Sequence, residues 1–156
     1  MTDKDTPFKA PNFSLPDDEG NIKTLGDYAG DWLVLYFYPK DETPGCTTQA
    51  CSLRDARDDL TDMGVQIVGV SKDSPESHER FKSKYNLNFT LLSDEDAEVI
   101  KSYGAWGSKM FGKDGILRST FIINPDGFVV KVFEKVTPIG HGKDMIKQIR
   151  DLQNIA

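Results

Sequence analysis

The sequence feature that most constrains the fold is an uninterrupted apolar run, WLVLYFY, at residues 32–38. A strand with one wet face alternates apolar and polar residues, so a run without alternation predicts a strand buried on both faces. VQIVGV at residues 65–70 has the same character and predicts a second such strand. Strands of this kind lie in the middle of α/β sheets, which places the chain in the α/β class.

Helical and hairpin patterns surround these two runs. Ser74 and Pro75 are an N-cap followed by proline at the first helical position. Apolar stripes at helical spacing predict one helix before residue 65 and a last helix near the C-terminus; their members are Cys46, Ala50, Leu53, Ala56, Leu60 and Met63, and Met145, Ile146, Ile149 and Leu152. STFIINPDGFVVKVF predicts two strands joined by a turn at residues 124–127, and FSLPDDEGNIKTL predicts an N-terminal β-hairpin.

The order of these elements predicts a central mixed β-sheet flanked by helices on both faces, in a single domain over residues 1–156. A thioredoxin-like fold fits this order, and so do other α/β sandwiches. No repeat, low-complexity tract or linker divides the chain.

Composition and charge limit the cellular location and the classes of partner that we expect. A formal charge of −6 argues against nucleic-acid and acidic-membrane binding, and no apolar run approaches the length of a membrane span. Two cysteines are too few for a disulfide scaffold, and the polar start MTDKDTPFKAPNF is not a secretory signal. We therefore expect a cytoplasmic protein that binds a small uncharged substrate or a protein partner.

The first cysteine stands at a predicted helix mouth. Thr43 is a good N-cap, Pro44 takes the first helical position, and Gly45 and Cys46 follow. Free backbone N–H groups and the positive end of the helix dipole favour negative charge there, so we expect Cys46 to ionise more readily than a free thiol. Gly45 leaves its N–H open to a ligand oxygen. The alternative is that Cys46 is a small buried apolar residue on the helix stripe.

The second cysteine follows five positions later. On a regular helix, Cα atoms five residues apart are separated by roughly 8.7 Å, whereas a disulfide needs less than about 7 Å. Cys46 and Cys51 therefore never bond, or the first turn and a half of the helix unwinds when they do. A zinc site is disfavoured because only His78 and His141 accompany the two thiols, and the C-x-x-C of a thioredoxin-type redox pair is absent.

At these residues the sequence resembles the peroxiredoxins. Pro39, Thr43 and Cys46 spell P-x-x-x-T-x-x-C, and YFYPKDETPGCTTQACSLRD is similar to the Q-type branch, the bacterioferritin comigratory proteins. The similarity extends to APNFSLPDDEGNIKTLGDYAGDWLVLYFYP, GVSKDSPESHERF and YGAWGSKMFGKDGILRSTFIINPDG.

The resemblance implies a thioredoxin-like fold and a thioredoxin-dependent peroxidase, an antioxidant enzyme that reduces hydrogen peroxide and organic hydroperoxides. It implies that Cys46 is the peroxidatic cysteine, that Thr43, Pro39 and Arg118 line its pocket, and that Cys51 resolves the oxidised thiol as a Cys46–Cys51 disulfide. Neither a metal nor an organic cofactor is implied. We expect a monomer that is re-reduced by thioredoxin or a similar dithiol.

The same residues are compatible with two other functions. A peroxide sensor would pass its disulfide to a partner protein, and a binding module would use both cysteines only for packing.

Several further residues carry weaker expectations. Gln49 is a polar residue three positions after Cys46, with no role assigned from the sequence alone. Trp106, Met110 and Phe111 could form an apolar rim for alkyl hydroperoxides or simply fill the core. We expect His78 to be a partly buried structural residue and His141 to begin the last helix. The acidic run SDEDAE predicts a solvated helix start with Ser93 as N-cap.

Overall fold

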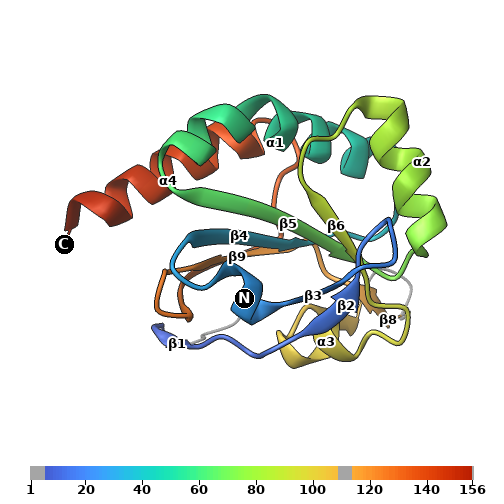
Figure 1. Cartoon of the computed structure of the whole chain (residues 1–156), viewed down its shortest axis with the longest axis horizontal. Coiled ribbons are helices and arrows are strands. Elements are labelled where there is room, and N and C mark those ends of the chain that lie inside the picture. Colours follow the sequence, from blue (N-terminus) through green and yellow to red (C-terminus); the bar gives the residue numbers. More distant parts are fainter. Residues whose placement is uncertain (1–5, 109–113, 156) are drawn as a thin grey trace.

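The computed structural model describes residues 6–108 and 114–155. Its centre is a six-stranded sheet with the strand order β1-β10-β9-β4-β5-β6 (Figure 1). Strands β4, β5 and β6 are parallel, and β9, β10 and β1 run antiparallel to their neighbours, so the sheet is mixed as predicted. The strand bounds are β1 Phe8–Lys9, β10 Phe128–Glu134, β9 Ser119–Ile123, β4 Trp32–Phe37, β5 Val65–Ser71 and β6 Thr90–Ser93.

Helices cover both faces of this sheet, which confirms the predicted α/β architecture. Helices α1 (Pro44–Asp62), α2 (Pro75–Tyr85) and α4 (His141–Ile155) lie on one face. The short helix α3 (Glu98–Ser102) lies on the other face, beside the N-terminal segment (Figure 1). Among the described residues, no helix is both long enough and apolar enough to cross a bilayer.

Two small hairpins complete the fold. The predicted N-terminal hairpin is present as β2 (Ser14–Pro16) and β3 (Ile22–Thr24), followed by the 3-10 helix η1 (Leu25–Tyr28). A second hairpin, which the sequence did not indicate, pairs β7 (Trp106–Ser108) with β8 (Asp114–Ile116).

The side chains of β4 explain why its sequence does not alternate. Leu33, Leu35 and Phe37 enter the apolar cluster under α3 and the N-terminal hairpin. Val34 and Tyr36 point the other way, into the cluster under α1, α2 and α4. All five are at most 1% exposed, so both faces of this central strand are core.

The predicted turn at residues 124–127 is present between β9 and β10. The Asn124 side-chain oxygen accepts hydrogen bonds from the N–H groups of Asp126 (3.1 Å) and Phe128 (3.0 Å). Gly127 has a φ of +88°, a conformation that glycine adopts without a steric penalty.

The expectation for the acidic run SDEDAE was wrong. Ser93 ends β6 and caps nothing, and α3 begins at Glu98. The Asp94 carboxylate takes the capping role instead, because it accepts a hydrogen bond from the Ile100 N–H at 2.7 Å. This carboxylate is buried rather than solvated, and burial raises its pKa.

Candidate active site

The register of the sheet brings Arg118 to the loop that carries Cys46. Cys46 lies in the first turn of α1, shortly after β4 ends at Phe37. Because β9 is antiparallel to β4, with Ser119 opposite Phe37, the residue just before Ser119 lies beside the end of β4. That residue is Arg118.

The guanidinium of Arg118 joins two side chains of α1. Its Nη2 lies 3.4 Å from the Cys46 sulfur, and its Nη1 donates a 2.6 Å hydrogen bond to Gln49 Oε1. Cys46 is 2% exposed and Gln49 is fully buried. Three residues separate Cys46 from Gln49, so both lie on the same face of the helix. A permanently charged group is thus held against the thiol inside a nearly closed site.

The start of α1 follows the predicted arrangement with one difference. Thr43 is the N-cap residue and Pro44 occupies the first helical position. The Thr43 hydroxyl does not cap the helix, however, because it donates to the Lys40 carbonyl at 2.9 Å. The first-turn N–H groups of Gly45 and Cys46 have no intrahelical partner, so they are available to a negative or polar ligand atom.

Glycine at position 45 permits this close packing. A Cβ added there would lie 3.1 Å from Arg118 Nη2 and 3.6 Å from the Pro138 ring. The backbone of α1, the guanidinium and the loop after β10 therefore meet at this point. Pro39, half-buried, directly follows Tyr38 at the end of the strand run and leads into the loop.

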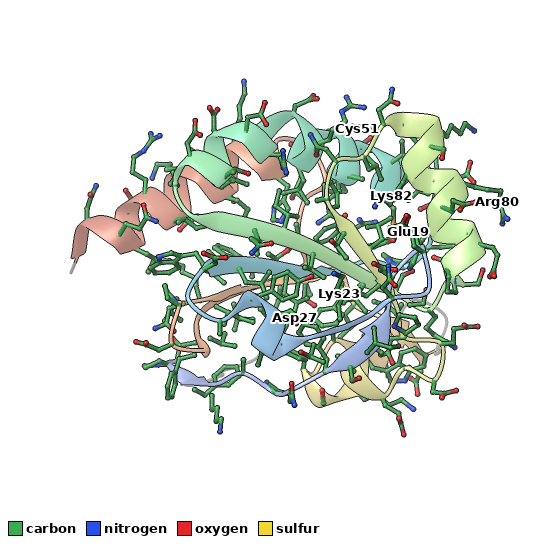
Figure 2. The ribbon with its side chains drawn as sticks, viewed as in Figure 1. Glu19, Lys23, Asp27, Cys51, Arg80 and Lys82 are labelled. Atoms are coloured by element: carbon green, nitrogen blue, oxygen red, sulfur yellow. The ribbon has the colours of Figure 1, made fainter. Side chains whose placement is uncertain are left out.

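Cys51 lies on the same unbroken helix, which runs from Pro44 to Asp62 (Figure 2). It is half-buried, and both cysteines are free thiols. An intact α-helix holds the two Cα atoms roughly 8.7 Å apart, beyond the reach of a disulfide. This geometry is compatible with both possibilities derived from the sequence: that the two cysteines never bond, or that the start of the helix unwinds when they do.

Tyr36 is a residue of this region that the sequence did not single out. Its hydroxyl is buried without a hydrogen-bond partner, as are Thr47 Oγ1 and Gln49 Nε2. Burial raises the pKa of Tyr36 well above its ordinary value, and a charge on Cys46 would raise it further, so the phenol keeps its proton. In the sequence, Tyr36 is one of several aromatic residues in the apolar run 32–38, and nothing there distinguishes it as a site residue.

The two histidines lie in different surroundings. His78 is fully buried, rather than partly buried as expected, and its Nδ1 lies 2.7 Å from Asp41 Oδ2. His141 begins α4 as predicted, and its Nε2 lies 3.0 Å from Thr120 Oγ1. Burial lowers the pKa of His141 to about 4; Asp144 opposes this shift and the charge on Arg118 adds to it.

Trp106 does not contact the residues around Cys46 in any described interaction. Lys72 and Lys101 place their ammonium groups 5.3 and 5.2 Å from its ring centroid. The other two residues of the suggested apolar rim, Met110 and Phe111, lie outside the described residues.

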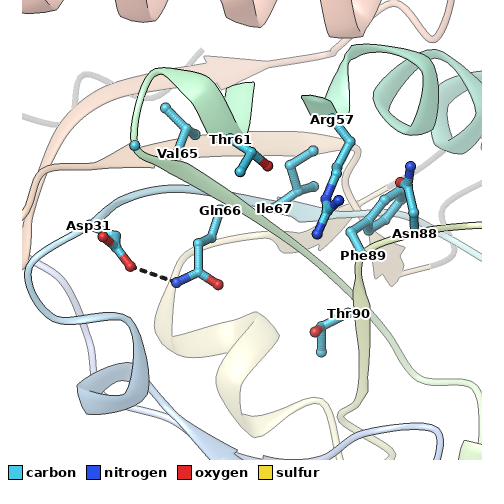
Figure 3. A pocket seen from close by; sticks show the side chains of 10 residues that line it. Asp31, Arg57, Thr61, Val65, Gln66, Ile67, Asn88, Phe89 and Thr90 are labelled. Atoms are coloured by element: carbon cyan, nitrogen blue, oxygen red, sulfur yellow. Dashed lines mark hydrogen bonds between the residues drawn. The ribbon is translucent and has the colours of Figure 1, made fainter. Parts of the chain in front are cut away.

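The hollow drawn in Figure 3 lies away from the cysteines. It has a volume of about 310 Å³ and is lined at the amino ends of β4 and β5 by residues such as Asp31, Val65 and Gln66. Cys46 instead follows the carboxyl end of β4, so it lies at the opposite end of the strands from this hollow. A 2.7 Å hydrogen bond from the Gln66 side-chain amide to the Asp31 carboxylate joins two of the residues that line this hollow.

Comparison with known proteins decides the family. The AhpC/TSA family profile matches residues 8–132. A putative peroxiredoxin bcp of Coxiella burnetii is 48% identical over 144 residues, covering 90% of this chain and 95% of that protein. This chain is a peroxiredoxin of the AhpC/TSA family. Peroxiredoxin Bcp of Escherichia coli K12 is 47% identical over 145 residues, covering 91% of this chain and 93% of the relative.

Solved structures agree with this assignment. A cysteine-to-serine mutant of Xylella fastidiosa PrxQ superposes with a TM-score of 0.92 at 32% identity, covering 98% of this peroxiredoxin and 99% of that chain. A mutant of Xanthomonas campestris Peroxiredoxin Q gives a TM-score of 0.85 at 39% identity, with coverages of 89% and 90%. The fold is therefore thioredoxin-like and the branch is the Q-type, as the sequence predicted.

Membership of this family establishes the general activity. The protein is a thiol peroxidase, an oxidoreductase that takes a peroxide substrate and a thiol reductant.

Proposed function

We propose that this peroxiredoxin reduces hydroperoxides through a two-cysteine cycle that begins at Cys46. The observation that carries the proposal is the 3.4 Å contact between Arg118 Nη2 and the Cys46 sulfur. A guanidinium stays charged at any working pH, so it favours the thiolate over the thiol throughout. The thiolate is the nucleophile that peroxide chemistry requires.

The first step oxidises Cys46. Its sulfur attacks one peroxide oxygen, the O–O bond breaks, and the second oxygen leaves with the bonding electron pair and takes up a proton. Cys46 becomes a sulfenic acid, and the peroxide becomes water or an alcohol. Arg118 and the N–H groups of Gly45 and Cys46 stabilise the charge that develops on the departing oxygen.

Thr43 and Pro39 would complete the pocket. Since the Thr43 hydroxyl proton is directed to the Lys40 carbonyl, its oxygen is free to accept the O–H of a hydroperoxide. That bond would orient the substrate for attack. Pro39 would limit access of water without adding a competing donor.

Cys51 then resolves the sulfenic acid. Its thiolate attacks the Cys46 sulfur, a hydroxide leaves as water after protonation, and the Cys46–Cys51 disulfide forms. The start of α1 must unwind first, because the intact helix keeps the two residues too far apart. Gly45 lowers the cost of melting this turn.

Ser52 marks where we expect the unwinding to stop. The N–H of Gly142 on α4 donates to Ser52 Oγ at 2.8 Å. The two backbones approach so closely that a Cβ at Gly142 would collide with the Ser52 carbonyl oxygen and lie 2.8 Å from Ala56 Cβ. Amide hydrogen exchange in the disulfide form should therefore rise over residues 45–51 and stay slow in α1 from residue 53 to residue 62.

The proposed substrates are hydrogen peroxide and organic hydroperoxides. Beside Gly45 and Arg118 runs the loop after β10, whose Val136 N–H donates to the Arg118 carbonyl at 3.1 Å. Next to Pro138 in this loop, Ile139 is 78% exposed, an unusual position for a large apolar side chain. We propose that it receives the alkyl part of an organic hydroperoxide. Alkyl peroxide reduction activity is ascribed to a solved relative, the Xanthomonas campestris Bacterioferritin Comigratory Protein, which supports this substrate class.

The proposed reductant is thioredoxin or a similar dithiol, acting on a monomer. Unwinding would expose the disulfide, so a reductant thiolate could reach either sulfur. We keep cytoplasmic location as part of the same proposal, because a reducing compartment supplies such dithiols.

Steady turnover of hydrogen peroxide with thioredoxin, thioredoxin reductase and NADPH tests this function. The wild type should turn over, Cys46→Ser should be inactive, and Cys51→Ser should react once and then stop. A wild type that oxidises once and accumulates a mixed disulfide with a partner would instead indicate the peroxide sensor. Unreactive thiols in the wild type would refute both.

A further inference from the structure

One buried carboxylate fastens the loop between β4 and α1 to α2. Asp41 Oδ1 accepts a 2.6 Å hydrogen bond from the Tyr38 hydroxyl. Asp41 Oδ2 accepts a 2.8 Å bond from the Ser77 hydroxyl and lies 2.7 Å from His78 Nδ1. The Asp41 N–H donates to Asp73 Oδ2 at 2.8 Å. The Asp41 side chain is 2% exposed and that of His78 is not exposed at all.

Asp41 and His78 form a buried hydrogen-bonded pair. His78 Nε2 lies 3.0 Å from the Leu92 carbonyl oxygen, which can only accept, so Nε2 carries a proton. The 2.7 Å contact between His78 Nδ1 and Asp41 Oδ2 holds one further proton between the two atoms. Tyr38 does not lose its own proton, because burial, and next the charge on Asp41, raise its pKa well above the ordinary value. A 2.7 Å hydrogen bond therefore joins the His78 imidazole to the Asp41 carboxyl group in the core.

The same residues do not make an attractive cation site. One ligand atom each from Asp41, Asp73 and His78 lie within 4.8 Å of one another. Two of these oxygens already accept hydrogen bonds from protein donors, however. Asp41 Oδ2 accepts from the Ser77 hydroxyl, and Asp73 Oδ2 accepts from the Asp41 N–H and, at 2.7 Å, from the Ser71 hydroxyl. The hydrogen bonds of this cluster therefore account for its geometry without a cation.

The network acts on the backbone just ahead of the cysteine. Glu42, between Asp41 and Thr43, has a φ of +63°, a left-handed conformation that a non-glycine residue adopts only when its surroundings impose it. Asp41 on one side is tied to α2 and the turn before it. A second tie to α2 is the 3.2 Å contact of Glu42 with Lys84. The position of Thr43, and of the N–H groups that follow it, depends on this segment.

We propose that Asp41 and His78 are positioning residues for peroxide attack at Cys46. Their buried hydrogen bonds hold the strained loop so that Thr43, the first-turn N–H groups and the Cys46 sulfur face the substrate together. This inference rests on the proposed function, in which Cys46 is the attacking thiol. It predicts an effect on the peroxide reaction that a general loss of stability would not produce.

The test compares two reactions of the same thiol. Hydrogen peroxide needs an aligned pocket, whereas iodoacetamide needs only an accessible thiolate. Asp41→Ala should slow oxidation of Cys46 by hydrogen peroxide about tenfold to a hundredfold and alkylation by less than about threefold. Asp41→Asn should keep the peroxide rate within about threefold of wild type, because its amide can donate to His78 Nδ1 and accept from the Tyr38 hydroxyl.

Asp18→Ala is the matched control. It removes the 3.0 Å ion pair with Lys82 on α2 (labelled in Figure 2) and leaves the hydrogen bonds of Asp41 in place. Its two rates should stay within about twofold of wild type even where its melting temperature falls as far as that of Asp41→Ala.

Other outcomes overturn the proposal. A folded Asp41→Ala that oxidises within twofold of wild type refutes it, and so does an equal loss in both reactions. If Asp41→Ala fails to fold, Tyr38→Phe, which removes one donor to Asp41, is measured in its place, and a selective loss of peroxide rate above twofold is expected. An unreactive wild type would count against the proposed function and not against this positioning role.

Discussion

The Arg118 guanidinium and the Cys46 sulfur come from positions 72 residues apart and lie 3.4 Å from each other. Gln49 fixes this relationship from the other side, because its carbonyl oxygen accepts a 2.6 Å bond from the same guanidinium. The charge is therefore preorganised before substrate arrives, which is the condition under which donors contribute most to catalysis. Changes that shift or loosen this guanidinium should therefore lower the rate of the peroxide reaction.

Gly45→Ala should impair the site without destabilising the protein. The new Cβ would lie 3.1 Å from Arg118 Nη2 and push the guanidinium away from Cys46. We expect the rate constant for oxidation by hydrogen peroxide to fall about tenfold. The free energy of unfolding should stay equal or rise by up to about 1 kcal/mol, because alanine favours a helix over glycine. Gly26→Ala, whose Cβ would make only ordinary contact, is the control and should leave the rate unchanged.

Gln49→Met should loosen Arg118, because it removes the acceptor and keeps a side chain of similar size. Loss of the acceptor leaves the guanidinium free to move, so kcat/KM for hydrogen peroxide should fall about five- to twentyfold. Stopped-flow fluorescence of the oxidation step provides the measurement. Gln66→Met removes a glutamine hydrogen bond of 2.7 Å at the distant hollow and should have no effect on this rate (Figure 3). Equal rates in wild type and Gln49→Met would show that Arg118 does not need this support.

Stability should fall as pH drops below 6.5, because of His141. Burial lowers the pKa of this residue to about 4, so between pH 6.5 and pH 4 the unfolded chain takes up a proton that the folded protein does not. The stability contribution is complete above pH 6.5 and is lost as pH falls through this window. Urea unfolding should show a loss of about 2 kcal/mol from this group between pH 7.5 and pH 5. His141→Gln should flatten the profile over that range, and an unchanged slope would contradict the assignment.

Ile139→Ser should discriminate between substrates. We expect kcat/KM for cumene hydroperoxide to fall about five- to tenfold while kcat/KM for hydrogen peroxide stays within about twofold, because only the organic substrate has an apolar group to bury. Ile22→Ser is the matched control, since Ile22 is 57% exposed on β3, in the N-terminal hairpin. If Ile139→Ser lowered kcat/KM equally for both substrates, the substitution would be acting on the catalytic groups and not on binding of the alkyl group.

Local sequence patterns predicted the fold well, because a strand that is buried on both faces has an uninterrupted apolar sequence. The run at residues 32–38 became the central strand β4 to within one residue. The helix mouth at Thr43 and Pro44 followed from capping preferences that act within one turn. The acidic run after Ser93 misled, because only the tertiary structure buries Asp94 and directs its carboxylate to the Ile100 N–H.

Long-range parts of the site could not be read from spacing. In the sequence alone, Arg118 is an ordinary charged residue at the start of a strand. Only the resemblance of the sequence to the peroxiredoxins identified it as a candidate pocket residue. Its contact with Gln49 depends on the pairing of β9 with β4, which no local pattern specifies. The Asp41–His78 pair joins residues 37 positions apart, and Ile139 became notable only through its exposure.

The most direct test of the account is the product formed with one equivalent of hydrogen peroxide, read by intact mass and peptide mapping after the remaining thiols are alkylated. The wild type should lose two hydrogens and yield a peptide pair linked through Cys46 and Cys51. Cys51→Ser should gain a single oxygen on Cys46 instead. Wild-type thiols that both remain open to alkylation, or a Cys51→Ser product with the same loss of two hydrogens, would contradict the two-cysteine cycle.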